Sequence, residues 1–466
     1  TLLIVCFLVV QKLFRDLQIE DVLSSIFGDL GPFIEDIVSY MITNESCTFQ
    51  YYSNFMRNHP VMDKNIRDDT QISRLLKYNI KEEDINLFLR AWNQMNNTKE
   101  CIYVGYDSTN FNTNAYGIEL ADYGHPKVDE GLPQYNLAYA VNQKDSTPLF
   151  YELYDGSVID NTELEIMLEE AKEFGHERLG VLMDRGYISE KNIKALRSKG
   201  YEYILMMKQN QKICQEIIEE YGAAVQSLEG YYIGEHGVYG TTVKKELYGQ
   251  EANIHVYYDD IRASEEKVAL MSRYETWEKE IEKKVAKKIA TEGEMKKYRK
   301  VFKLKYDQNG YLVAYQRNSR YIKEEIRNLG FFFIITSEDM SASKALDIYR
   351  GRDNIEKMFR SLKSGIDFNK ARVHTTESLK SKVFVTFIAM IIRNELFQKA
   401  EVLRKKNRKA YTVPGILSEL ENIECTRNSV GKYRRKYALT SKQKQILKQF
   451  GMDEKYIDAG ISKFSY

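Results

Sequence analysis

The stretch from Cys101 to Met207 constrains the fold most, because its apolar residues alternate between the spacing of β-strands and the spacing of α-helices. At Cys101 the apolar period becomes two, which indicates a β-strand that ends at Asp107. Further apolar runs indicate strands at 135–142, 148–154, 178–183 and 203–207, with helices at 161–174 and 190–199. The order β-β-β-α-β-α-β predicts an α/β fold built on a small sheet.

Two of these strands are followed directly by an aspartate, Asp107 after the first strand and Asp184 after the fourth. Ligands of α/β sheets bind at the carboxyl ends of strands, so both side chains are candidates for a shared site. Aspartate is also common in turns, and for either residue alone a turn is the simpler interpretation. A third acidic residue on a neighbouring element would favour the shared site.

The stretch YRGRDNIEKMFRSLK, residues 349–363, has the apolar spacing of a helix. We expect Ser341 or Ser343 to cap the start of this helix and Gly365 to end it in a left-handed conformation. At about 100° per residue, four polar side chains fall on one edge of the helix, within about 60° of one another. They are Tyr349, Arg352, Glu356 and Lys363.

This polar edge allows two interpretations. In the first, Glu356 pairs with Arg352 and Arg360 four residues away, and the edge is a solvated salt-bridge face. In the second, Glu356 holds a hard cation, and the other three side chains donate hydrogen bonds to phosphate oxygens. Gly351 inside the helix costs about 1 kcal/mol relative to alanine, and a close approach of the backbone to a ligand would explain it.

The spacing Tyr-x2-Arg-x3-Glu-x6-Lys resembles, at all four positions, the YREK signature of bacterial insertion-sequence transposases of the cut-and-paste DDE type. The segments YVGYDST, GVLMDRGY and IITS extend this resemblance over most of the chain. The resemblance implies a ribonuclease-H-like catalytic core with a β-rich insertion between the second aspartate and the glutamate. The expected elements of this chain follow the same order.

Three carboxylates that converge repel one another unless a divalent cation lies between them. Oxygen ligands with room for water select Mg²⁺ or Mn²⁺, and two such ions about 3.5–4 Å apart would support an in-line displacement at a phosphodiester. The resemblance assigns metal binding and catalysis to Asp107, Asp184 and Glu356. It assigns DNA contacts near the cleaved end to Tyr349, Arg352 and Lys363.

The expected elements divide the chain into regions around this core. We expect a helical N-terminal region at 1–97, the core at 98–208 and 330–400, the β-rich insertion at 209–329 and a basic helical C-terminal region at 401–466. Within the insertion, Asn309-Gly310 predicts a hairpin, and a charged helix is expected at 264–291. Trp277 on that helix either stacks on a flipped base, as in some relatives, or is an exposed aromatic residue.

Both ends of the chain are candidates for further DNA contacts. The segments DDTQISRLLKYN and KEEDINLFLRAW fit a helix-turn-helix that reads DNA ends, or a helix pair that serves only as scaffold. The C-terminal region has 15 Lys and Arg residues against seven acidic ones, which suits either a solvated surface or one that faces phosphates or a partner. Because the net charge of the whole chain is only +1, any basic surface must be local.

Cysteine usage and the apolar start bear on the compartment. Five scattered cysteines without a CxxC pair argue against a zinc site and suit a reducing cytoplasm. The segment TLLIVCFLVV has about half the length of a membrane span, and no positive residue precedes it as in a signal peptide. Since the sequence begins at Thr1, we expect this segment to be the buried start of a helix in a truncated N-terminal region.

The leading hypothesis is a cytoplasmic DNA transposase that cleaves and joins phosphodiester bonds at insertion-sequence ends, without contact to a membrane. Its partners would be double-stranded DNA, both the terminal inverted repeats and the target, and a second copy of the chain in an active homodimer. Two alternatives stay open. One is an inactivated or host-adopted derivative that binds DNA without cutting it, and the other is a metal-dependent nuclease of the same fold.

Overall fold

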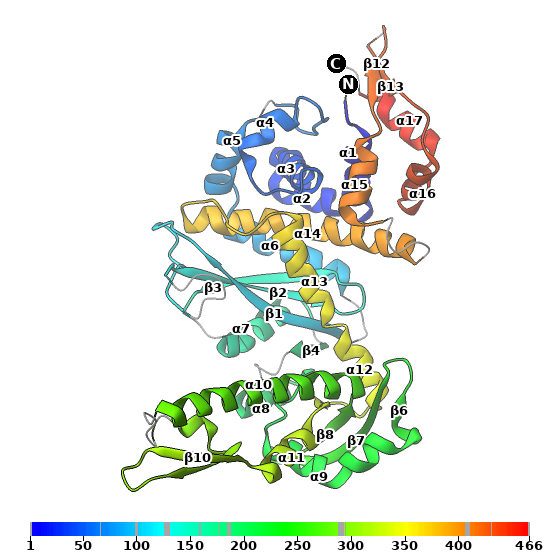
Figure 1. Ribbon diagram of the computed structural model, residues 1–466. Coiled ribbons are helices and arrows are strands. Elements are labelled where there is room, and N and C mark those ends of the chain that lie inside the picture. Colours follow the sequence, from blue (N-terminus) through cyan, green and yellow to red (C-terminus); the bar gives the residue numbers. More distant parts are fainter. Residues whose placement is uncertain are drawn as a thin grey trace. The chain divides into compact units, whose positions relative to one another are not determined.

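A computed structural model of the protein describes residues 2–65, 67–97, 101–124, 131–157, 160–176, 178–183, 188–287, 293, 295–405, 411–429 and 431–464. The contacts within the chain divide it into two compact units, whose elements are labelled in Figure 1. The first unit comprises residues 1–183, 194–201 and 350–466, and the second comprises residues 184–193 and 202–349.

The N-terminal part of the first unit is helical, as its apolar period predicts. The apolar start forms α1 (Val5–Asp16), whose residues from Val5 to Val10 are all buried. The other helices are α2 (Ile19–Phe27), α3 (Gly31–Thr43), α4 (Tyr52–Phe55), α5 (Asp69–Arg74) and α6 (Glu82–Asn96). Trp92 of α6 donates a hydrogen bond to the carbonyl of Pro148 at 2.8 Å, which docks α6 on the sheet. Among the described helices, none has the length and apolarity to cross a membrane.

The predicted β-β-β-α-β-α-β order is present. Its elements are β1 (Ile102–Asn112), β2 (Gln134–Asn142), β3 (Pro148–Asp155), α7 (Asp160–Glu173), β4 (Leu179–Met183), α8 (Glu190–Ser198) and β5 (Glu202–Met206). In the first unit the strands lie in the order β3-β2-β1-β4. Strand β2 is antiparallel to both β1 and β3, whereas β4 runs parallel to β1 with Leu182 opposite Gly105.

Strand β1 does not end at Asp107, as we expected, but continues to Asn112. Its parallel pairing with β4 is described only as far as Gly105, whereas its antiparallel pairing with β2 extends to Asn112, opposite Gln134. Because β2 supplies hydrogen-bond partners along this length, β1 continues beyond the end of β4, its shorter parallel neighbour. Asp107 therefore lies inside a strand, just beyond the described pairing with β4.

The C-terminal part of the first unit begins with α13 (Asp353–Arg360) and the π-helical turn η7 (Ser361–Gly365). Helix α14 (Thr376–Arg404) follows, and Thr375 caps its start by accepting a hydrogen bond from the Ser378 amide. The remaining elements are α15 (Val413–Glu421), β12 (Cys425–Arg427), β13 (Tyr433–Arg435), α16 (Ser441–Gln449) and α17 (Glu454–Ser462).

The helix expected over 349–363 is interrupted at Gly351. Helix α12 (Ala342–Arg350) ends before this glycine, and α13 begins two residues after it. Ser341 caps α12 as predicted, since its hydroxyl accepts a hydrogen bond from a backbone amide three residues later at 3.2 Å. We expected Gly365 to be left-handed, and this prediction was wrong. The residue with a positive φ near the end of this segment is Asp367, at 56°.

The second unit contains strands in the order β5-β11-β8-β7-β6. The strands after β5 are β6 (Tyr232–Ile233), β7 (Val238–Leu247), β8 (Gln250–Tyr258) and β11 (Phe331–Thr336). Within the expected insertion, strands β6 to β8 thus extend a sheet through pairing of β8 with β11, and do not form a sheet of their own. The boundaries of the insertion and of the other expected domains stay predictions.

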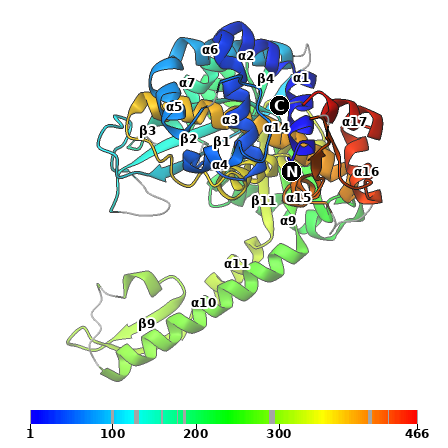
Figure 2. The same cartoon turned by 90° about the horizontal axis from the view of Figure 1, so that it is seen from above.

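A separate lobe of the second unit is built on the long helix α10 (Asp260–Lys287), which Figure 2 shows beside β9 and α11. The predicted hairpin is present as β9 (Phe302–Tyr306) and β10 (Leu312–Arg317), and it packs on α10 through an apolar cluster that includes Tyr274, Tyr298 and Phe302. Helices α9 (Lys212–Ser227) and α11 (Ser319–Asn328) had no counterpart among the expected elements.

Candidate active site

Three of the predicted site residues come together in the first unit. Strand β1 carries Asp107, and Arg352 and Glu356 lie one turn apart at the start of α13. The guanidinium of Arg352 bridges the two carboxylates, with Nη2 3.9 Å from Asp107 Oδ2 and Nη1 3.4 Å from Glu356 Oε1. The side chain of Arg352 is 16% exposed, against 26% for Asp107 and 53% for Glu356. Both carboxylates are therefore accessible to a ligand from solvent.

Close packing places α13 against β1 and β2, an arrangement visible in Figure 1. Gly105 of β1 faces Ile355, whose Cβ would lie 3.8 Å from a Cβ at position 105. Gly351 lies against Gln143, whose side-chain atoms would be 2.0–2.5 Å from a Cβ at position 351. Asn354 donates a hydrogen bond to the Gln143 carbonyl at 2.9 Å. Gly351 thus serves the packing against Gln143, whereas we expected a ligand there.

Lys363 of η7 contacts β1 next to this group of Asp107, Arg352 and Glu356. Its Nζ donates a hydrogen bond to Thr109 Oγ1 at 2.7 Å and lies 5.3 Å from the centroid of the Phe111 ring. Thr109 and Phe111 follow Asp107 at intervals of two residues, so the three side chains share one face of the strand. Neither residue was predicted as part of the site, because β1 was expected to end at Asp107. The two-residue spacing beyond Asp107 was the signal that would have identified them.

The structure does not test the predicted positions of Asp184 and Tyr349 in this site. Asp184 lies outside the described residues. Tyr349 belongs to the second unit, at the end of α12, and its exposed fraction is 6%. Within the described ranges, no group of three or more His, Cys, Asp or Glu side chains could hold a metal ion. The structure therefore brings together two of the three predicted acids, and the assignment of the full set stays a prediction.

The chemistry of this donor set fits a hard divalent cation. Two neighbouring carboxylates are stabilised by a positive charge between them, and here the Arg352 guanidinium provides that charge. Carboxylate oxygens are also the ligands that Mg²⁺ and Mn²⁺ prefer. Asp107 and Glu356 are accordingly the described residues that could hold such an ion.

Trp277 of α10 is half-buried, not an exposed aromatic residue on a charged helix. Its ring packs edge-on against Tyr298, with centroids 5.6 Å apart, and the Arg273 guanidinium lies 5.4 Å from the Trp277 ring centroid. These contacts belong to the apolar cluster under the β9–β10 hairpin. Packing of this lobe is sufficient to account for the position of Trp277.

The two ends of the chain are largely helical, and the C-terminal region also contains the strands β12 and β13. The N-terminal helix pair is present as α5 and α6, with the π-helical turn η3 (Leu75–Asn79) after α5. In the C-terminal region, ion pairs neutralise part of the positive charge, since Arg435 lies 3.1 Å from Glu454 and 2.6 Å from Asp458. Contact of either region with DNA stays a prediction.

The family of this chain follows from its match to one family model. A family model described as "Transposase DDE domain" matches residues 104–392, which is more than half of the chain and includes the site residues above. No curated protein matches the chain. Among solved structures, the chain is similar to one described as "Cryo-EM structure of piggyBac transposase synaptic complex with hairpin DNA (SNHP)", with 10% identity and a TM-score of 0.40. That similarity covers 93% of this chain and 75% of the other.

Proposed function

Since this chain belongs to the DDE transposase family, we propose that it is a DNA transposase that cleaves and joins phosphodiester bonds at the ends of a bacterial insertion sequence. The observation that carries the proposal is the pairing of Asp107 and Glu356 with one guanidinium. A carboxylate pair that requires a positive charge, and that solvent can reach, is what a metal-dependent phosphodiester reaction needs.

Asp107, Asp184 and Glu356 would hold two Mg²⁺ or Mn²⁺ ions. Strand β4 pairs in parallel with β1, with Leu182 opposite Gly105, and Asp184 and Asp107 each follow two residues later in the sequence. This register supports the inclusion of Asp184 in the site. When bound, such ions would activate a water or a 3′-hydroxyl of the DNA and would stabilise the leaving oxygen. The protein contributes the oxygen ligands and their fixed positions on β1 and α13.

Arg352, Lys363 and Tyr349 would bind the DNA backbone, in the manner of the YREK signature. The guanidinium of Arg352 presents a planar set of donors that suits two oxygens of one phosphate. Lys363 donates a hydrogen bond to Thr109, which lies on the same face of β1 as Asp107. It would act as a point charge on a neighbouring phosphate. Tyr349 would add a neutral donor or a stacking face. Contacts of this kind position the DNA without reading its sequence.

The order and directions of strands β3-β2-β1-β4 support a ribonuclease-H-like core as the scaffold of this site. The proposed partners are double-stranded DNA, at the terminal inverted repeats and at the target, and a second copy of the chain in an active homodimer. We place the protein in the cytoplasm, where the DNA of a bacterial element lies.

Cleavage of DNA that carries the flanks of the gene tests the proposal. An end-labelled duplex is incubated with the full chain and Mg²⁺, and cleaved and joined products are separated on a gel. Asp107→Asn, Asp184→Asn and Glu356→Gln should each reduce the cleavage rate by more than about 100-fold, because loss of a residue that only orients a metal ligand already costs about 10–100-fold. DNA binding, measured by gel shift, should be retained.

Asp353→Asn is the matched control, because Asp353 is an exposed acid on the same helix and should be dispensable. Cleavage without any joined product would identify a metal-dependent nuclease. Binding without cleavage by the unsubstituted chain would identify an inactivated derivative. Full cleavage by Asp107→Asn or Glu356→Gln would contradict the assignment of the site.

A further inference from the structure

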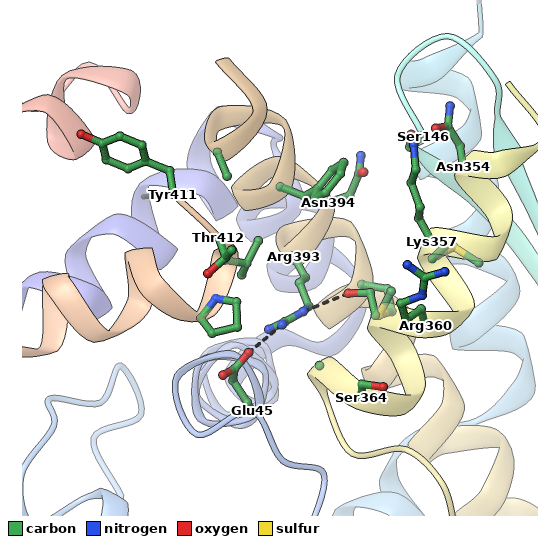
Figure 3. A pocket seen from close by; sticks show the side chains of 18 of the residues that line it. Glu45, Ser146, Asn354, Lys357, Arg360, Ser364, Arg393, Asn394, Tyr411 and Thr412 are labelled. Atoms are coloured by element: carbon green, nitrogen blue, oxygen red, sulfur yellow. Dashed lines mark hydrogen bonds and ion pairs between the residues drawn. The ribbon is translucent and has the colours of Figure 1, made fainter. Parts of the chain in front are cut away.

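Helix α13, which carries Glu356, also lines a cavity of about 360 Å³, shown in Figure 3. The residues of α13 and η7 that face this cavity include Asn354, Lys357, Met358 and Ser361. At about 100° per residue, the mean direction of these four residues lies about 150° around the helix from Glu356. The cavity and the candidate active site thus share one helix but use different faces of it.

The walls of the cavity are largely apolar. The side chains that make them apolar come from α13, α14 and the start of α15, and they are Met358, Met390, Phe397, Val413 and Pro414. Cavities of several hundred Å³ with apolar walls and a few polar groups are typical of small-molecule sites. The volume and the walls therefore suit a flat organic group better than a bare inorganic ion.

The polar centre of the cavity is Arg393, whose exposed fraction is only 4%. Its Nε donates a hydrogen bond to Ser361 Oγ at 2.9 Å, and Nη2 donates to Glu45 Oε1 at 2.6 Å, as the dashed lines of Figure 3 mark. Its Nη1 has no hydrogen-bond partner among the described residues. A buried donor without a partner is costly, and a ligand oxygen in the cavity would satisfy it.

Two further features show that the cavity is built around positive charge. A Cβ at position 365 would lie 2.5 Å from Nε and Nη2 of Arg393, so the glycine there makes room for the guanidinium. Arg404, which pairs with Glu401, also lines the cavity, and its Nε is a second buried donor without a hydrogen-bond partner in the part of the chain that the structure describes.

The rim adds exposed cations. Lys357 and Arg360 line the cavity from α13, and both residues are exposed. Against these cations and the two arginines, the described part of the lining contains one acidic residue, Glu45, which is already paired with Arg393. The cavity therefore has an excess of positive charge over apolar walls.

We propose that this cavity binds a nucleotide unit, with the base against the apolar walls and the phosphate near Arg393, Lys357 and Arg360. A nucleotide combines the two properties that the lining recognises, a flat group with apolar faces and an anion that accepts charge-assisted hydrogen bonds. The choice of a nucleotide rests on the proposed function, because a transposase binds DNA and so brings nucleotides close to this cavity. The unit is either an unpaired nucleotide of the DNA strand or a free nucleotide.

Calorimetric titration of the full chain, without divalent ions, tests the site. The probes are dAMP, deoxyadenosine and inorganic phosphate. We expect dAMP to bind at least about tenfold more tightly than either of the other two, because each of those presents only one of the two recognised groups. Binding of dAMP no tighter than that of phosphate would overturn the proposal.

Variants at the rim locate the binding. Arg393→Gln risks unfolding, since the side chain is buried, so the exposed pair Lys357→Gln and Arg360→Gln is used together and is expected to weaken dAMP binding about tenfold or more. Lys370→Gln removes an exposed lysine of the same unit that does not line the cavity, and it should leave the affinity unchanged. Equal affinities of the rim variant and the Lys370 variant would refute the location.

Glu356→Gln separates this proposal from the proposed function, because it should bind dAMP like the unsubstituted chain while DNA cleavage is lost. Two duplexes that differ by one unpaired terminal nucleotide then distinguish the sources. Displacement of dAMP by the tailed duplex alone would identify a nucleotide of the DNA strand. Displacement by neither duplex would identify a free nucleotide as the ligand.

Discussion

Replacement of Arg352 by glutamine should strengthen the binding of Mg²⁺ to the free protein, although it removes a positive residue from a DNA-binding site. The guanidinium of Arg352 lies between the carboxylates that we propose as metal ligands. A divalent ion that binds both carboxylates must displace this guanidinium from them. The energy of the two ion pairs therefore opposes metal binding in the absence of DNA.

The distances between Arg352 and the two carboxylates allow an estimate of the energy that opposes metal binding. At 3.4 Å and 3.9 Å, and with an effective dielectric constant of about 20, the two attractions amount to roughly 5 and 4 kcal/mol before desolvation. Desolvation and solvent screening reduce such pairs strongly, and Glu356 is half-exposed, so about 1 kcal/mol for each pair is a realistic value. Loss of about 2 kcal/mol of competition corresponds to roughly 30-fold tighter metal binding, and loss of one pair to about fivefold.

Calorimetric titration of Mg²⁺ or Mn²⁺ into the full chain measures this effect. Arg360→Gln is the matched control, because Arg360 is an arginine of the same helix that lines the cavity instead. Arg352→Gln should gain between fivefold and 30-fold in metal affinity and lose DNA affinity, whereas Arg360→Gln should keep the metal affinity. An Arg352→Gln protein that binds the ion as weakly as the unsubstituted chain, or more weakly, would refute a metal site shared by Asp107 and Glu356.

Two further predictions concern Lys363 and the N-terminal helices. Lys363→Met should reduce the slope of log K against log salt for DNA by about 0.9, so that its affinity relative to the unsubstituted chain changes about 3.5-fold between 50 and 200 mM salt; an unchanged slope in fluorescence anisotropy titrations would exclude a phosphate contact. Burial, together with the charges of Glu20 and Asp36, raises the pKa of Glu35 from 4.5 to about 8. The folded state thus keeps a proton that the unfolded state releases, so the free energy of unfolding falls as pH rises from about 4.5 to about 8. In urea denaturation, Glu35→Gln should remove roughly 3 kcal/mol of this fall between pH 5 and 7.5, and a pH dependence like that of the unsubstituted chain would contradict this.

Local patterns in the sequence were sufficient for much of the fold. The two-residue period of β1 and the apolar segments of β4 and β5 depend only on residues near in sequence, and each predicted a strand that the structure contains. The same holds for the spacing that put Arg352 and Glu356 on one edge of a helix. Their convergence with Asp107 was implied by the family resemblance, whereas the expected strand end at Asp107 was wrong, since β1 continues to Asn112.

The features that the sequence did not predict depend on contacts between distant residues. The end of β1 is set by its pairing with β2, and the interruption of the helix at Gly351 accompanies packing against Gln143, more than two hundred residues earlier in the chain. The half-buried position of Trp277 depends on a hairpin that folds back onto α10. A period in the sequence reports which side of an element is buried but does not identify what covers it.

Two glycines, more than the charged residues themselves, determine where the charged groups on α13 and beside it lie. Gly351 lets the start of the helix approach Gln143, and this brings Arg352 and Glu356 over Asp107 on β1. Gly365 admits the Arg393 guanidinium at the other end and so places the cation of the cavity. A side chain at either position would have to displace the group packed against it, while every charge remained in the sequence. The polar spacing therefore specifies which chemistry is present, and the small residues around it specify whether the charged groups meet.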